Sequence, residues 1–145
     1  MDIFIEFNAF DYVTSNMSRA CINKNSLIEE IKNSELQDGI TFSGGDPMMQ
    51  PLACLEIAKA CQELGFNVWC YTGFLFEELL DKKDCLEFLK YIDVLVDGPF
   101  IESKKSYSAK YRGSKNQRII NVKPSLKKQK AVLVKEYIIR DKLVK

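Results

Sequence analysis

One nine-residue stretch constrains the fold of this chain most strongly. It is Gly39–Pro47 (GITFSGGDP), which begins apolar and β-branched and ends with two glycines, an acid and a proline. The apolar part predicts a short buried strand. Gly44 and Gly45 allow a sharp turn or a close approach to a ligand, and Pro47 favours the first turn of a helix. Ligand sites of α/β proteins have this pattern, but so does a plain turn between a strand and a helix. We call Ser43–Asp46 the glycine elbow.

The length and the residue types limit the possible chemistry. The chain has 145 residues, no histidine and five cysteines. This length predicts a single domain over residues 1–145, with an irregular N-terminal part at 1–25 and a charged tail at 135–145. Without histidine, Ser-His-Asp and Cys-His catalysis and histidine metal sites are excluded. The cysteines form no Cys-x-x-Cys pair and are predicted to be small, mostly buried thiols. They are Cys21, Cys54, Cys61, Cys70 and Cys85.

Hydropathy and charge indicate where the chain functions and what it contacts. No apolar run reaches the roughly 18 residues that a membrane span needs, and no basic leader precedes the first strand, so we expect a cytoplasmic protein without a membrane partner. Residues 1–81 carry 4 basic and 13 acidic side chains, whereas residues 82–145 carry 17 basic and 7 acidic ones. The run 104–130 holds ten Lys or Arg and no acid. Such asymmetry is typical of a surface for an anionic partner or cofactor.

Hydrophobic periodicity predicts an alternation of helices and strands. From residue 26 the order is helix, strand, helix, strand, two helices, strand, which is typical of a parallel sheet with right-handed crossovers. The predicted helices are 26–34, a segment from after Pro47 to Leu64, 74–80 and 83–91, and the strands are 39–43, 66–71 and 92–96. Further strands are predicted at 2–7, 118–122 and 131–134, irregular loops at 8–25 and 101–116, and a turn or short helix at 124–129.

Three strand ends and one loop carry distinctive residues. The strand ends are Ser43–Asp46, Tyr71–Gly73 and Asp97–Gly98, and the loop is Tyr111–Arg118. Because the carboxyl ends of parallel strands meet at one edge of a sheet, we expect the three strand ends to lie within reach of one small ligand. They offer backbone groups, a hydroxyl and two carboxylates, which suit an ammonium group or a hard cation.

Each of these residues also has a purely structural interpretation. Asp97 is a cap or turn residue before Gly98 in that interpretation, and Asp46 is an acid at a helix N-terminus. Arg112 either holds a carboxylate through two hydrogen bonds or belongs to a solvated basic loop.

The four segments, in this order, resemble the radical S-adenosylmethionine family, and within it the proteins that activate glycyl-radical enzymes. The resemblance covers about residues 25–134. The matching residues are 40–47, 68–73, 94–98 with Phe100, 111–114 and 116–118. It implies an α/β fold, an incomplete (β/α) barrel with a mostly parallel sheet. Ser43, Gly44, Gly45 and Asp46 would hold the amino group of S-adenosylmethionine, Thr72 and Asp97 would lie near its methionine end, and Arg112 would bind its carboxylate or a partner.

The resemblance also implies cofactors and partners. In the family a [4Fe-4S] cluster reduces S-adenosylmethionine, and the resulting radical abstracts hydrogen from a glycine of the partner enzyme, so the cofactor performs the oxidoreductase chemistry. The implied partner is a glycyl-radical enzyme, in particular anaerobic ribonucleotide reductase, and the implied electron donor is flavodoxin or a similar protein. No residue of this chain is assigned a catalytic role.

The sequence departs from the family at the cluster loop. Family members bind the cluster through Cys-x3-Cys-x2-Cys after the first strand, but Cys21 is the only cysteine before Gly44, and Glu6 stands where the last cysteine would be. Either the chain is N-terminally truncated after the cluster loop, or it is a degenerate member that has lost radical chemistry. Both readings predict impaired activity and no metal ligands.

Two other functions are compatible with the sequence. One is a non-catalytic partner that regulates a glycyl-radical enzyme. The other is a module in which the basic run 104–130, with Tyr107 and Tyr111, binds nucleic acid or another polyanion. A generic basic patch would not need the ordered Arg112-Gly113-Ser114 and Asn116-Gln117-Arg118, so a nucleic-acid partner is disfavoured.

Overall fold

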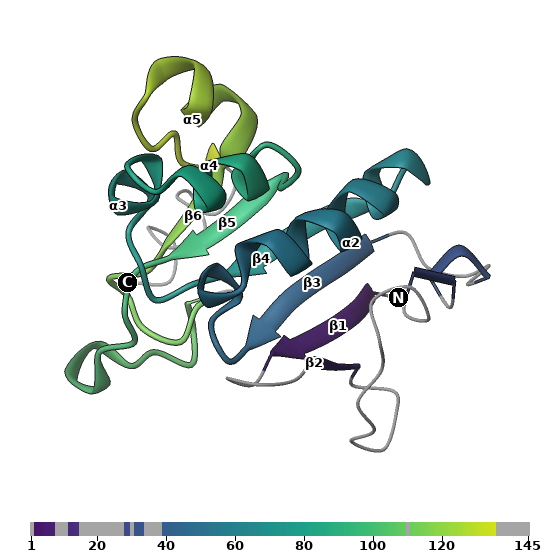
Figure 1. Cartoon of the computed structure of the whole chain (residues 1–145). Helices are drawn as coiled ribbons and strands as arrows, with labels where there is room; N and C mark the ends of the chain where they lie inside the picture. The colour runs from purple at the N-terminus through teal and green to yellow at the C-terminus, as the bar shows by residue number, and fades with distance from the viewer. Residues whose placement is uncertain are drawn as a thin grey trace.

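The described part of the chain forms one sheet with helices packed on it (Figure 1). The computed structural model describes residues 2–7, 12–14, 28–29, 31–33, 39–109 and 111–135. Within these residues the sheet has six strands in the order β2-β1-β3-β4-β5-β6. The strands are β1 (Asp2–Phe7), β2 (Tyr12–Thr14), β3 (Gly39–Gly44), β4 (Asn67–Tyr71), β5 (Val94–Asp97) and β6 (Arg118–Asn121).

The centre of the sheet is parallel, as the alternation of helices and strands predicts. β1, β3, β4 and β5 pair in parallel, in chain order. β2 and β6 pair antiparallel with β1 and β5 at the two edges. The carboxyl ends of β3, β4 and β5 therefore lie at the same edge of the sheet. The α/β class is confirmed, but the described sheet is open between β2 and β6, so the structure does not show a closed barrel.

Two predicted segments differ from the structure. Residues 12–14 belong to the predicted irregular loop but form β2, because Val13 and Thr14 pair with β1 and suit an extended backbone. Residues 131–134 do not form the predicted strand; Leu133 makes only an isolated bridge to Ile120. Of the predicted helix 26–34, residues 28–29 and 31–32 are helical. Residue 33 of this segment forms a turn, and its remaining residues, most of the loop 8–25 and the tail 136–145 lie outside the described residues.

The helices follow the expected order and lie mainly on one face of the sheet. Those between the parallel strands are η1 (Pro47–Met49), α2 (Pro51–Glu63), α3 (Phe76–Leu80) and α4 (Lys83–Leu89), and those after β5 are η2 (Glu102–Lys104) and α5 (Val122–Lys128). Figure 1 shows α2 crossing in front of β3 and β4. Prolines start η1 and α2, where the missing N–H removes no helical hydrogen bond. Gly65, with φ of +79°, follows the end of α2.

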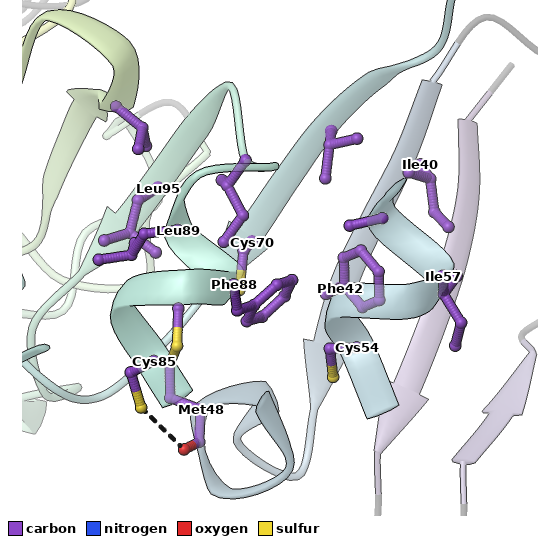
Figure 2. Close-up of a cluster of buried hydrophobic side chains, with 14 of the residues drawn as sticks. Ile40, Phe42, Met48, Cys54, Ile57, Cys70, Cys85, Phe88, Leu89 and Leu95 are labelled. Atoms are coloured by element: carbon purple, nitrogen blue, oxygen red, sulfur yellow. Dashed lines mark hydrogen bonds between the residues drawn. The ribbon is translucent and has the colours of Figure 1, made fainter. Parts of the chain in front are cut away.

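The core lies between the sheet and the helices α2 and α4 (Figure 2). Ile40 and Phe42 of β3 point toward these helices, and Cys54, Ala58 and Cys61 are buried along α2, so both cysteines are buried as the sequence predicts. The rings of Phe42 and Phe88 meet edge to face, with centroids 5.4 Å apart. None of the helices within the described residues is long and apolar enough to cross a membrane.

Phe88→Ala tests this core. The side chain is fully buried, so its removal leaves a cavity and should lower the free energy of unfolding by about 3–5 kcal/mol. Urea unfolding followed by circular dichroism measures the loss. Phe100→Ala is the matched control, because Phe100 is 52% exposed and its removal should cost well under half as much. Equal losses in both variants would contradict the assigned core.

Candidate functional site

The glycine elbow lies at the carboxyl end of β3, as the sequence predicts. Ser43 is half-buried, and Gly44 and Gly45 are exposed. Gly44 has φ of +92°, a backbone conformation that strains any residue with a Cβ. The turn therefore presents bare backbone at the edge of the sheet.

Asp46 connects the elbow to the neighbouring strand end. One carboxylate oxygen accepts a hydrogen bond from the Met48 N–H at 3.0 Å and so caps η1. The hydroxyl of Thr72 donates to the same carboxylate at 2.9 and 3.1 Å, and the Gly73 N–H donates to it at 2.8 Å. The structure thus brings Asp46 and Thr72 together, and Asp46 has the helix-terminal role of its structural interpretation in addition to a contact across strands.

Backbone hydrogen bonds continue from Thr72 to the end of β5. The Phe74 N–H donates to the Thr72 hydroxyl at 3.2 Å, and the Gly98 N–H donates to the Phe74 carbonyl at 3.0 Å. Gly98 is buried and has φ of +99°, which again favours glycine. The second and third strand ends are therefore joined.

Asp97 is fully buried and fixes three elements against one another. It accepts hydrogen bonds from the Phe76 N–H at 2.8 Å and from the Arg118 guanidinium, whose Nε lies 3.0 Å from Oδ1. The same guanidinium forms two hydrogen bonds to Glu77, at 3.1 and 2.8 Å. The hydrogen bond from Arg118 lowers the pKa of Glu77, and hydrogen bonds to the two carboxylates raise the pKa of Arg118. The structural interpretation from the sequence, a cap or turn residue before Gly98, did not include these contacts with distant residues.

Three consecutive side chains hold three consecutive residues of the opposite segment. Arg118 pairs with Asp97, Gln117 donates to the Gly98 carbonyl at 3.0 Å, and Asn116 donates to the Pro99 carbonyl at 2.7 Å. We call Asn116–Arg118 the latch. The sequence identifies these residues only by their match to the family motif and by the charge of Arg118. It does not reveal their partners, which lie about 20 positions away along the chain.

The latch also fixes the loop that contains Arg112. The Gln117 side-chain oxygen accepts hydrogen bonds from the N–H groups of Gly113, at 2.8 Å, and Ser114, at 3.2 Å. Arg112 donates to the Gln117 carbonyl at 3.3 Å. Tyr111 packs edge to face on Trp69 of β4, with ring centroids 5.1 Å apart. Arg112 is therefore joined to the other predicted site residues through Gln117.

A continuous line of hydrogen bonds thus connects all four segments of the predicted site. It runs from Asp46 through Thr72, Phe74 and Gly98 to Gln117. We call it the strand-end network. It makes one structural unit of segments that are more than 70 positions apart in the sequence.

The described cysteines do not fit an iron–sulfur cluster. The Cys54 thiol donates to the Pro47 carbonyl and the Cys85 thiol to the Met48 carbonyl, so both support η1 (Figure 2). Burial raises the pKa of Cys54, Cys70 and Cys85 and raises that of Cys61 to about 12. Cluster ligands are thiolates, a form that burial disfavours at these positions. No group of three possible metal ligands occurs in the part of the chain that the structure describes, which excludes Cys21.

Comparison with known proteins identifies the family. The profile of the family described as "4Fe-4S single cluster domain" matches residues 9–120. The chain belongs to this family. No solved structure matches it significantly.

Relatives of this chain carry a name that is more specific than the description of the family. Proteins named anaerobic ribonucleoside-triphosphate reductase-activating protein are 34% identical over 102 residues in Vibrio cholerae and 35% identical over 104 residues in Haemophilus influenzae. These matches cover 66% and 68% of this chain, and 64% and 65% of the relatives. The counterpart from Enterobacteria phage T4 is 34% identical over 98 residues, which is 64% of this chain and 58% of the relative. The chain thus spans less than two thirds of these relatives. They confirm the resemblance read from the four segments.

Anaerobic reconstitution with iron and sulfide tests the assignment of the thiols. We expect the isolated chain to retain well under one cluster per chain, because the described cysteines are buried and no three possible metal ligands lie together in the described part of the chain. Iron and sulfide analysis after desalting measures the content, and absorbance near roughly 400 nm reports cluster formation. A stoichiometric cluster with a reducible EPR signal would contradict this expectation.

Proposed function

We propose that this chain is an activating protein for an anaerobic ribonucleotide reductase, and that it binds S-adenosylmethionine at the glycine elbow. The observation that carries the proposal is the strand-end network, which unites the four segments shared with the radical S-adenosylmethionine family. The activating proteins of Vibrio cholerae and Haemophilus influenzae support the choice of partner. The same proposal takes the open sheet to be an incomplete (β/α) barrel in a cytoplasmic protein.

The chain's own residues suit the amino-acid end of this cofactor. Gly44 and Gly45 expose their backbone beside the Asp46 carboxylate, and an ammonium group is recognised by carbonyl and carboxylate oxygens. Because Asp46 is fixed by Thr72 and Gly73, the elbow is ordered before a ligand binds, which lowers the entropy cost of binding. Asp97 and Arg112 act in this proposal by fixing the neighbouring strand end and loop.

Under this proposal the chain by itself has impaired radical chemistry, because its described cysteines do not fit the cluster. A non-catalytic regulator of a glycyl-radical enzyme is therefore the second candidate, and the buried thiols are the observation that favours it. An electron donor such as flavodoxin belongs only to the first candidate. With an anaerobic ribonucleotide reductase added, a glycyl-radical EPR signal would contradict the regulator. Because impaired chemistry also predicts a weak or absent signal, binding of S-adenosylmethionine separates the two candidates, since only the activating protein requires it.

Binding of S-adenosylmethionine tests the site directly. Isothermal titration calorimetry should show binding by the wild type, and Asp46→Ala should weaken it by about tenfold or more, equivalent to about 1.4 kcal/mol. Asp81→Ala is the matched control, since Asp81 is an exposed acid at the end of α3. Thermal melts establish that each variant is folded.

Two results would contradict the proposed site. One is a wild type that does not bind S-adenosylmethionine. The other is a folded Asp46→Ala variant that binds it as tightly as the wild type and the Asp81→Ala control.

A further inference from the structure

Residues 99–109 and 111–116 form a projection whose backbone is tied by hydrogen bonds, and we call these residues the arm. The latch ties both of its ends together. Within it, the Lys115 N–H donates to the Lys104 carbonyl at 2.9 Å, and the Ser106 N–H donates to the Gly113 carbonyl at 3.2 Å. The Ile101 N–H donates to the Ser114 hydroxyl, also at 3.2 Å. Figure 1 shows this green segment extending from the side where β3 and β5 end.

The arm exposes aromatic and cationic side chains. Phe100 is 52% exposed and Tyr107 is 93% exposed. Lys104, Lys105 and Lys115 are also exposed, and Glu102 is the only acid in residues 99–116. Exposed apolar groups on an ordered backbone are typical of interaction sites, where large aromatic side chains contribute much of the binding energy.

Phe100 is held in place although half of it faces outward. A Cβ on Gly113 would lie 3.0 Å from Cδ2 of its ring, so the absence of a side chain there lets the ring pack against the backbone of the arm. The Gly113 N–H in turn donates to Gln117 of the latch. The backbone that the ring packs against is therefore itself held by the latch, and such ordering reduces the entropy lost when a partner binds.

We propose that the arm is a docking surface for an acidic protein segment that places an apolar side chain on Phe100 and carboxylates on the lysines. The excess of lysine over acid on the arm specifies the charge of the partner, and the exposed ring specifies the apolar contact. The arm begins directly after Asp97 and Gly98, so the bound segment lies beside the strand-end network. Under the proposed function, on which this identification rests, the segment belongs to the reductase.

The distribution of positive charge favours a protein over a nucleic acid. The basic run 104–130 is divided between the arm and α5, which lie at opposite ends of the sheet in Figure 1. Between them Arg118 is paired with two carboxylates, and within α5 Lys123 lies 3.4 Å from Asp93. A nucleic-acid strand binds best along a continuous cationic path, whereas these cations are divided between two places and partly paired.

Two matched charge reversals test the proposal. One variant carries Lys104→Glu, Lys105→Glu and Lys115→Glu on the arm. The control carries Lys127→Glu, Lys128→Glu and Lys130→Glu, three exposed lysines at the other end of the sheet. Both change the net charge equally. The probe is a fluorescent peptide rich in glutamate with a central phenylalanine, followed by anisotropy at low and high salt, beside an oligonucleotide of equal charge.

We expect the wild type to bind the peptide in a salt-sensitive way. The arm variant should bind the peptide about tenfold or more weakly than the wild type does. The control variant should have an affinity within about twofold of the wild type. Phe100→Ser should weaken binding by at least about threefold, with the salt dependence retained. The proposal is overturned if the wild type does not bind the peptide, if both reversals weaken it equally, or if the oligonucleotide binds more tightly than the peptide through the arm.

The two proposals fail separately. If the chain binds the peptide through the arm but does not bind S-adenosylmethionine, the docking surface stands and the proposed function falls. If it binds S-adenosylmethionine but the peptide result is negative, the docking surface alone is wrong.

Discussion

The carboxylate of Asp46 links the ends of β3 and β4 beyond their last paired residues. The pairing of β3 with β4 extends to Phe42 and Cys70. Beyond that point the side chain of Asp46 holds the elbow to the Thr72 loop through hydrogen bonds. Hydrogen bonds to a charged acceptor contribute about 1.5–3 kcal/mol each. One side chain therefore extends the order of the sheet into the loops of the candidate site.

Side chains also extend the strand pairing at the other end of the network. β5 and β6 pair from Val94–Asn121 to Asp97–Arg118. The latch then continues this antiparallel pairing with side chains, since Gln117 and Asn116 reach the carbonyls of Gly98 and Pro99. The arm projects from this ordered base. The candidate ligand site and the candidate docking surface are thus two ends of one hydrogen-bonded unit.

The sequence predicts the parts of this structure that depend on local pattern. Periodicity located the parallel strands and the helix α2, and the glycines located the elbow. It did not predict β2, because three residues carry little periodic signal and their pairing with β1 decides their conformation. It also left the partner of Arg118 open, because that partner, the buried Asp97, is brought to it only by the antiparallel pairing of β5 with β6.

Amide hydrogen exchange at Gly73 tests the network most directly. Gly73 donates to Asp46 and has no direct contact with Gln117. If the network is one unit, Gln117→Ala should raise exchange at Gly113, which loses its acceptor, and also at Gly73, by about tenfold for each 1.4 kcal/mol lost. The amide of Val68, which donates to Asp93 at the opposite end of β4, should not change. Faster exchange at Gly113 with unchanged exchange at Gly73 would contradict a connected network.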